Sequence, residues 1–196
     1  DDMEDKPALY RRTRDRFAQM DEAEQRECLR RYLAVCTYED ELFGELLARA
    51  ESLGLMENTY IAYTSDHGDY MGAHRLWAKG LPCFREAYSV CAMVSGPGVR
   101  GGREVGHMVS LSDFAPTFLE ASGAPFDPAR FRGRSLVPFL RGEVPAAWRD
   151  AHFTQTNGNE VYGMQRAVWT DRWKYVFNMF DYDELYDLQA DPGETK

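Results

Sequence analysis

The sequence predicts an α/β fold in which a mixed sheet is flanked by helices and followed by a small antiparallel subdomain. Between residues 21 and 123, strand-like apolar runs alternate with helical segments, a pattern typical of parallel or mixed sheets covered by helices. After Pro145 the pattern changes to short strands rich in aromatic and β-branched residues, which favours antiparallel pairing. We therefore expect an α/β domain over residues 1–145 and a separate subdomain over residues 146–196.

The longest expected element is a helix over residues 21–53. Gly54 stands just after the apolar pattern and is placed to end this helix. Residues 1–20 show no clear apolar period and are expected to form a loop or short helix that packs outside this chain. Apolar residues recur along the long helix at spacings of three and four, and we expect this stripe in a core: Leu29, Tyr32, Leu33, Cys36, Phe43, Leu46, Leu47 and Ala50.

The remaining expected elements are short. Gly123 is expected to close the last helix of the first domain, and Asp171-Arg172 to form a tight turn within the subdomain. The expected strands span residues 60–64, 90–95, 107–109, 152–156, 163–170 and 173–178, and the expected short helices span residues 82–87 and 112–120.

Composition and charge narrow the possible functions. The chain has 196 residues, of which 44% are hydrophobic, which is enough for one domain with a real core. A net charge of −9 disfavours nucleic acid as a partner. No apolar run approaches the roughly 20 residues that a membrane span requires, so we expect no such span. No signal peptide is visible, and the localisation stays open between cytoplasm and periplasm.

The cysteines do not indicate a disulfide framework. Cys28 and Cys36 lie on the long expected helix about 12 Å apart, too far to bridge. A pairing of Cys83 with Cys91 stays open. Scattered thiols of this kind fit a reducing compartment slightly better than a secreted one.

The segment Ser65-Asp66-His67-Gly68 is the first candidate for a functional site. It follows the expected strand 60–64, and ligands bind at the carboxyl ends of strands in open α/β sheets. A carboxylate and an imidazole side by side are ordinary ligands of a divalent cation, and Gly68 permits a sharp turn or a close approach. Taken alone, such a pair is more often a cap or a hydrogen-bonded loop pair than a metal site.

A longer run gives this segment a specific resemblance. Residues 64–80, Thr-Ser-Asp-His-Gly-Asp-Tyr-Met-Gly-Ala-His-Arg-Leu-Trp-Ala-Lys-Gly, resemble the second metal- and anion-binding motif of the sulfatases, in the alkaline-phosphatase superfamily of metal-dependent ester hydrolases. The resemblance implies that Asp66 and His67 ligate the active-site cation and that Lys79 binds the sulfate oxygens. His74 is a candidate substrate contact or proton donor. Ca²⁺ is the expected metal, with Mn²⁺, Mg²⁺ and Zn²⁺ as alternatives.

The resemblance continues along the chain. Asp113 begins an Asp-x-x-Pro-Thr segment, and Gly133 begins a Gly-x-Ser-Leu turn, that are similar to segments of the family. Residues 184–194 look like its C-terminal subdomain. We therefore expect the C-terminal half of a sulfatase, with a partial alkaline-phosphatase/sulfatase-like fold, whose substrate is a sulfate-ester small molecule or glycan.

One part of a sulfatase active site is not found in this sequence. The family's nucleophile comes from a Cys/Ser-x-Pro-x-Arg motif, and none of the four cysteines is followed by Pro at the required position. Ser95 has the Pro, but Val99 stands where the Arg is needed. We expect a sulfuric ester hydrolase as the full-length parent and no activity from this chain alone. Two alternatives stay open: a phosphonate or phosphate ester hydrolase of the same superfamily, and a non-catalytic module that forms homo-oligomers through an exposed half-domain face.

Overall fold

The computed structural model of the chain describes residues 3–158 and 161–196 and contains two compact units. The first, the four-strand unit, consists of the described residues up to Leu55, His67–Val90 and Phe153–Lys196. The second, the two-strand unit, consists of Met56–Asp66 and Cys91–His152. The chain passes from the two-strand unit to the four-strand unit between Asp66 and His67.

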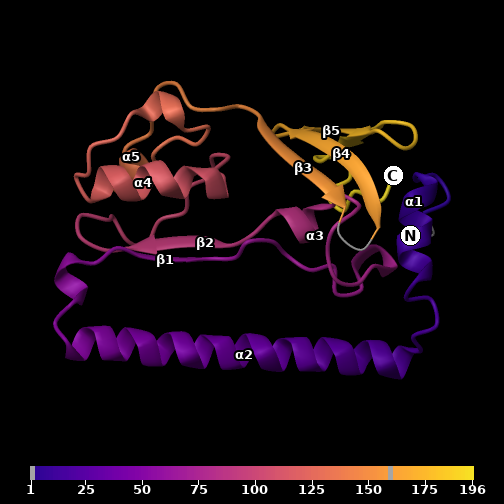
Figure 1. Cartoon of the computed structure of the whole chain (residues 1–196), viewed down its shortest axis with the longest axis horizontal. Helices are drawn as coiled ribbons and strands as arrows, with labels where there is room; N and C mark the ends of the chain where they lie inside the picture. Colours follow the sequence, from indigo (N-terminus) through magenta and orange to yellow (C-terminus); the bar gives the residue numbers. More distant parts are fainter. Residues whose placement is uncertain (1–2, 159–160) are drawn as a thin grey trace. The chain divides into compact units, whose positions relative to one another are not determined.

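An antiparallel sheet, with its strands in sequence order, is the frame of the four-strand unit (Figure 1). It contains β3 (His152–Gly158), β4 (Tyr162–Trp169), β5 (Trp173–Asn178) and β6 (Glu184–Asp187). A tight turn at Asp171-Arg172 joins β4 to β5, and the Thr170 amide donates to the Trp173 carbonyl at 2.8 Å. The predicted C-terminal antiparallel sheet is confirmed, and β6 adds a strand that the pattern of short strands did not include.

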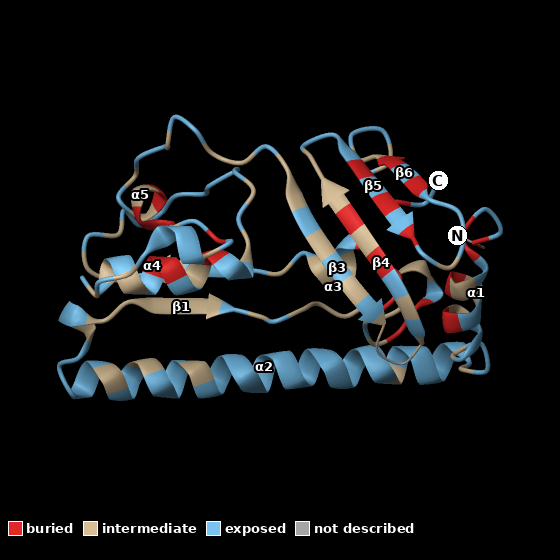
Figure 2. Cartoon of the chain, turned by 45° about the horizontal axis from the view of Figure 1, so that its top comes forward, coloured by how far each residue is buried: buried red, intermediate tan, exposed pale blue. Residues whose placement is uncertain are grey.

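The core of this unit lies on the inner face of the sheet. Exposed and buried residues alternate along β5, so that Lys174, Val176 and Asn178 are the buried set. Figure 2 shows buried residues in β4, β5 and β6, and also in α1 (Ala8–Asp15). The buried cluster comprises Met3, Tyr10, Tyr70, Leu76, Cys83, Phe84, Ala87, Ala167, Val176 and Tyr186.

The first helix packs against the sheet of this chain. The hydroxyl of buried Tyr10 donates to Glu184 of β6 and accepts from the Gln165 amide of β4. The Ala8 amide donates to Asp181 Oδ2 at 2.9 Å. A short helix is therefore present as expected, but it does not pack outside the chain. Buried Tyr10 anchors this helix to the sheet, so the helix packs there without a periodic apolar pattern.

The predicted long helix is α2 (Glu22–Ser52). Asp21 begins it with a capping box: the Glu24 amide donates to Asp21 Oδ1 at 2.8 Å, and the Asp21 amide donates to Glu24 Oε2 at 2.9 Å. Gly54 follows its end with a φ of 69°, the left-handed conformation that glycine adopts without strain. Within the described residues, no helix, α2 included, is long and apolar enough to cross a membrane.

The apolar stripe of α2 is largely exposed among the described residues, and only Phe43, Leu47 and Ala50 are half-buried. No residue of the helix is fully buried, and Leu33 and Leu46 are 55% and 63% exposed. An amphipathic stripe becomes a core only where a matching apolar surface packs on it. The expectation that these residues form a core is therefore not met within this chain.

In the two-strand unit, β1 (Ile61–Thr64) pairs with β2 (Ala92–Ser95) (Figure 1). The pair is antiparallel, with Ile61 opposite Ser95. The alternation that favoured a parallel or mixed sheet presumes a compact helical crossover between neighbouring strands. Here residues 67–90, which lie between the two strands in sequence, belong to the other unit. The helices α4 (Phe114–Ala121) and α5 (Val137–Leu140) also belong to this unit.

Other departures from the expected elements are local. Residues 107–109 form no strand, and the helix expected at 82–87 is the single turn α3 (Arg85–Tyr88). The helix expected from Ser112 is preceded by a 3-10 turn that Ser110 caps. All four cysteines are free, which agrees with the absence of a disulfide framework and leaves Cys83 and Cys91 unpaired with each other.

Asp113 is the polar centre of the two-strand unit. Its side chain is fully buried, and its oxygens accept from the amides of Ser110 and Arg134, each at 2.8 Å. Both Nη atoms of Arg149 donate to it at 2.6 Å. This bidentate pair satisfies the buried carboxylate and ties three separate segments together.

We expect Asp113→Ala to lower the free energy of unfolding by about 3–5 kcal/mol, because the substitution leaves a mostly buried Arg149 guanidinium without its partner. Denaturant unfolding followed by circular dichroism measures the loss. Asp127→Ala is a suitable control, because Asp127 accepts only from the nearby Ala129 amide in a surface turn, and its loss should cost about 1 kcal/mol. Equal losses in the two variants would contradict the central role of Asp113.

Candidate metal and anion site

The predicted site residues lie in the loop that follows β1. Asp66 stands two residues after the end of the strand and is exposed. His67 is half-buried and is the first residue of the loop that belongs to the four-strand unit. Of the two residues, only His67 therefore belongs to the same unit as the rest of the loop.

His67 and Lys79 are in direct contact. Lys79 Nζ lies 2.6 Å from His67 Nε2, and His67 Nδ1 lies 2.9 Å from the carbonyl oxygen of Gly68. A carbonyl oxygen only accepts, so Nδ1 carries the proton, and in the neutral ring Nε2 then offers a lone pair. The Lys79 ammonium lies beside that lone pair. The Lys79 residue is exposed.

The loop between these two residues has an unusual backbone conformation. Side-chain-bearing residues seldom adopt positive φ, and each such residue costs about 1–3 kcal/mol unless its surroundings enforce the conformation. Four of them occur within eight positions, with φ between 42° and 62°: Met71, His74, Arg75 and Ala78. Concentrated strain of this kind is a feature of functional sites.

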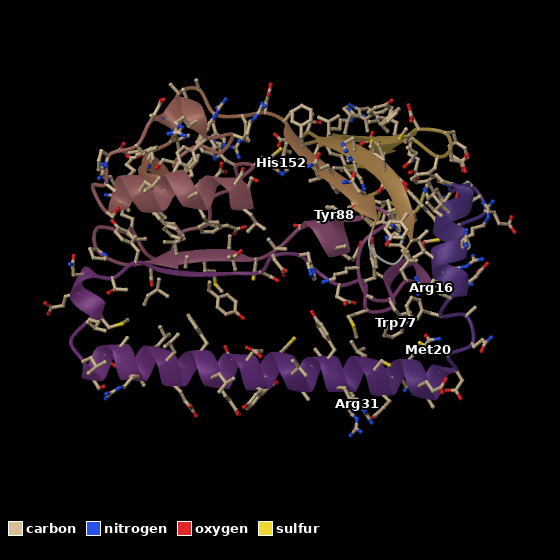
Figure 3. The ribbon with its side chains drawn as sticks, viewed as in Figure 1. Arg16, Met20, Arg31, Trp77, Tyr88 and His152 are labelled. Carbon is tan, nitrogen blue, oxygen red and sulfur yellow. The ribbon has the colours of Figure 1, made fainter. Side chains whose placement is uncertain are left out.

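Backbone hydrogen bonds and one large side chain hold the loop closed. The Tyr70 amide donates to the Ala78 carbonyl at 2.9 Å, and the Gly72 amide donates to the Leu76 carbonyl at 2.8 Å. Trp77, labelled in Figure 3, belongs to this loop. It is buried, and its ring comes within 3.5 Å of where a side chain on Gly72 would begin. Trp77 therefore has a packing role within the loop, as expected for a large apolar ring.

His74 points inward within the loop. Its side chain is 4% exposed, its ring stacks on Phe84 with centroids 3.9 Å apart, and its Nε2 lies 3.5 Å from Glu86 Oε2. The neighbouring imidazole outweighs burial and holds the pKa of the Glu86 carboxyl below its usual range. Sequence reasoning did not single out Glu86, because this contact depends on the left-handed turn at His74 and has no local sequence signal.

Gly68 is required where the loop meets α3. Its amide donates to the Ala87 carbonyl at 2.9 Å, and a side chain at this position would begin 1.9 Å from the Glu86 carbonyl oxygen. Only glycine permits so close an approach between the two backbones. His67 is therefore fixed through its neighbour to α3.

The other polar candidates have structural contacts. Asp69 accepts from the Met71 amide at 2.9 Å in a local turn, and His107 packs against Phe139. Burial, with a smaller contribution from Arg149, lowers the pKa of His152. In the part of the chain that the structure describes, no three His, Cys, Asp or Glu side chains are grouped to hold a metal ion.

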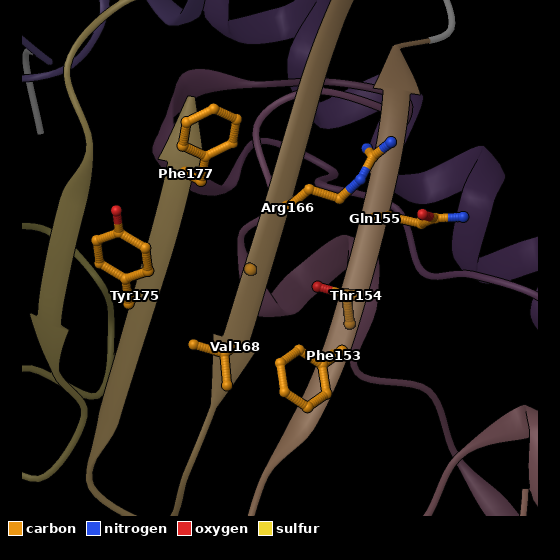
Figure 4. A pocket seen from close by; sticks show the side chains of 8 residues that line it. Phe153, Thr154, Gln155, Arg166, Val168, Tyr175 and Phe177 are labelled. Carbon is orange, nitrogen blue, oxygen red and sulfur yellow. The ribbon is translucent and has the colours of Figure 1, made fainter. Parts of the chain in front are cut away.

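A separate shallow hollow lies on the outer face of the sheet (Figure 4). None of the predicted site residues borders it, and most of its lining is apolar. It is lined by Phe153, Thr154, Gln155, Arg166, Ala167, Val168, Tyr175 and Phe177.

The fold is a partial fold of the alkaline-phosphatase superfamily, and comparison with known proteins identifies the family. The profile of the Sulfatase family matches residues 4–124. A second profile, for the C-terminal region of N-sulphoglucosamine sulphohydrolase, matches residues 72–196. The chain belongs to the sulfatase family.

Three relatives illustrate the similarity. Arylsulfatase K of Xenopus laevis is 30% identical over 93% of this chain and 35% of its own length. The structure of a 2-O GAG sulfatase is 28% identical, with a TM-score of 0.86 over 93% of this chain and 41% of that one. A protein in complex with its substrate D-glucosamine-2-N,6-O-disulfate is 29% identical, with a TM-score of 0.75 over 98% of this chain and 40% of that one. The chain spans about a third of the length of the curated relatives it matches.

A different ester chemistry also occurs among proteins of this fold. The phosphonate monoester hydrolase of Silicibacter pomeroyi is 25% identical, with a TM-score of 0.79 over 88% of this chain and 37% of that one. The fold alone therefore does not separate sulfate from phosphonate esters.

Substitution of Gly68 by Ala should destabilise the chain by about 1–3 kcal/mol, because the new methyl group would overlap the Glu86 carbonyl. Gly44→Ala is the matched control: Gly44 lies inside α2 with no atom within 4 Å of the new methyl group, so alanine should stabilise by about 0.5–1 kcal/mol. Thermal and denaturant unfolding measure both changes. Changes of the same sign would show that the close approach at Gly68 is not needed.

Proposed function

We propose that this chain supplies the cation- and sulfate-binding part of the active site of a sulfatase-family hydrolase of sulfate esters. The observation that carries the proposal is the contact between His67 Nε2 and Lys79 Nζ, within a loop that resembles the family's motif. One side chain offers a lone pair to a cation, and the other offers a positive charge to an anion. Both are needed beside a sulfate ester, and both come from one strained loop.

Asp66 and His67 are the proposed ligands of a divalent cation, with Ca²⁺ as the first expectation. The bond from His67 Nδ1 to the Gly68 carbonyl supports this role, because metal-bound imidazoles are commonly oriented through their second nitrogen. A divalent cation, when bound, polarises the sulfate oxygens. Two protein ligands are too few for a hard cation, so the affinity of this chain alone should be low and further ligands should come from elsewhere in the parent protein.

Lys79 is the proposed partner of the nonbridging sulfate oxygens. Its ammonium is a compact charge with three donors, suited to an oxyanion. The net charge of −9 gives the chain a field that repels anions at long range. Local charge from Lys79 and the cation must therefore dominate at the site.

We propose a positional role for His74. Its side chain is buried against Phe84 and faces Glu86, so it fixes the turn between His67 and Lys79. From this position the ring supports the loop.

The nucleophile would come from residues that this chain does not contain, so the chain alone should be inactive. In this proposal residues 1–145 form part of the catalytic α/β domain, and residues 146–196 form its C-terminal subdomain. Relatives named for a GAG sulfatase and for a disulfated glucosamine substrate support a sulfated glycan as the substrate class.

A phosphonate ester hydrolase is the second candidate, and its structural similarity to this chain supports it. Sulfate monoesters and phosphonate monoesters both carry one negative charge and similar tetrahedral oxygens. The positive charge of Lys79 suits both kinds of ester, so a measured binding preference has to decide between a sulfatase and a phosphonate ester hydrolase.

We expect methyl sulfate to bind the chain weakly in the presence of Ca²⁺, and Lys79→Gln to weaken this binding by about tenfold or more, because it removes a charge-assisted contact. Nuclear magnetic resonance titration measures the affinity. Lys196→Gln is the control, since it removes the same charge outside the loop. Equal effects of the two substitutions would contradict the anion role of Lys79, and much tighter binding of methyl methylphosphonate would favour the second candidate.

We also propose that the chain self-associates through the exposed apolar stripe of α2. Apolar surface left uncovered on a helix is a common site of association. Leu33→Lys should shift the chain toward monomer in light scattering at high concentration. Ala34→Lys adds the same charge on the opposite side of the helix and should leave association unchanged. A monomer before any substitution would refute the proposal.

A further inference from the structure

A buried ion pair lies beneath the candidate site. Lys174 of β5 and Glu194 near the end of the chain are 1% and 0% exposed, and Lys174 Nζ donates to Glu194 Oε2 at 2.7 Å. Neither residue belongs to the cation- or anion-binding set proposed above. We propose that this pair is a positioning device, which fixes residues 83–87 and through them the loop that carries His67, His74 and Lys79. The purpose assigned to the device rests on the proposed function.

The pair holds the backbone on both sides of Phe84. Lys174 Nζ donates to the Cys83 carbonyl, and the Arg85 amide donates to Glu194 Oε2 at 3.2 Å. Charged partners make these hydrogen bonds stronger than neutral ones. Phe84 therefore stands between two backbone groups that are each bonded to one member of the pair.

Phe84 passes this constraint to His74. Its ring is 1% exposed, lies edge-on to Tyr10 and Tyr186, and stacks on the His74 ring with an interplanar angle of 13°. Because Phe84 is packed on several sides, it restricts the movement of the His74 ring that stacks on it. The left-handed conformation of His74 therefore has a rigid support.

The same segment also supports His67 and Lys79. Gly68, next to His67, bonds to the Ala87 carbonyl and lies against the Glu86 backbone. Gly80, next to Lys79, receives hydrogen bonds from the hydroxyls of Tyr70 at 3.2 Å and Tyr88 at 3.1 Å. Tyr88 is the last residue of α3, so both ends of the loop rest on the segment that the ion pair holds.

Burial of an ion pair in a core is unfavourable in itself, because both charged groups lose their hydration. Burial raises the pKa of Glu194 and lowers the pKa of Lys174, and in each case the partner's charge opposes the effect. Aromatic faces assist the cation, with Lys174 Nζ 4.3 Å from the Trp169 centroid and 4.9 Å from that of Tyr186. Apolar residues of similar volume often replace buried ion pairs without loss of stability. Geometry at residues 83–87, more than stability, is then what the pair supplies.

The test separates geometry from stability. The double variant Lys174→Met with Glu194→Met keeps the volume of the core and removes the two hydrogen bonds that join the pair to the Cys83 carbonyl and the Arg85 amide. Its melting temperature should stay close to that of the unsubstituted chain. The ring protons of His74, shifted by the stacked Phe84, should move toward the positions of an unstacked histidine. Carbon–proton spectra of the four histidines, assigned with His74→Gln, show this directly.

Two further variants keep the test decisive. Glu194→Asp retains the charge but shortens the side chain, and it should perturb His74 even if the double variant fails to fold. Val176→Ala is the control: it thins the same face of β5 without touching a hydrogen bond of residues 83–85, and should lower stability with His74 unmoved. Unchanged His74 signals in a folded double variant, or in Glu194→Asp, would overturn the positioning role.

Ligand binding gives an independent reading. The double variant should bind methyl sulfate about tenfold or more weakly, as expected when the support of a binding side chain is lost. If the unsubstituted chain binds no sulfate, the proposed function fails, whereas the His74 spectra still decide the positioning role. If sulfate binds equally well to both while His74 moves, the device does not reach Lys79 and the proposal is overturned in that part.

Discussion

The burial of Phe84 is the contact on which the core of the four-strand unit and the loop of the candidate site depend. Its ring meets Tyr10 from α1, Tyr186 from β6 and His74 from the loop, and the Lys174 ammonium lies 5.3 Å from its centroid. These partners come from the beginning, middle and end of the described chain. A hydrophobic contact has no direction of its own, so the surrounding hydrogen bonds and charges decide how the ring is oriented. The candidate site therefore depends on a packing arrangement that lies entirely beneath it.

The loop above this core combines strain with charge. Four side-chain-bearing residues at positive φ are unfavourable in isolation, and the loop is stable only because its hydrogen bonds and the buried Trp77 and Phe84 leave no lower-energy alternative. The result is a direct contact between His67 and Lys79, which brings one lone pair and one positive charge together at the surface of the loop. A flexible loop would lose this arrangement, because mobile lysines pay conformational entropy each time they bind.

Much of the architecture was predictable because its signals are local. The glycine after α2 and the turn at Asp171-Arg172 are short-range patterns with one physical solution, and the structure contains both of them. The position of Asp66 and His67 after β1 was likewise predictable from the end of an apolar run. The partners of the loop were not, because Glu86, Lys174 and Glu194 act through contacts across long sequence separations. The strand expected at 107–109 fails for the opposite reason: a local apolar pattern there has no neighbouring strand to pair with among the described residues.

The prediction that residues 21–53 form a helix was confirmed, whereas the prediction that its apolar stripe lies in a core was not. The same physical reason explains both outcomes. Helix formation depends on capping and on side-chain pairs within the helix, such as those between Glu27 and both Arg30 and Arg31, and these need no other part of the protein. Full burial of the stripe needs a second surface, and no residue of α2 is fully buried by the described residues. By contrast, the loop of the candidate site has its whole support within the four-strand unit: the sheet, α3 and the Lys174–Glu194 pair. The geometry of His67 and Lys79 should therefore be set before any further part of a sulfatase domain packs on α2, so that such packing would complete the site around an existing arrangement and would not have to create it.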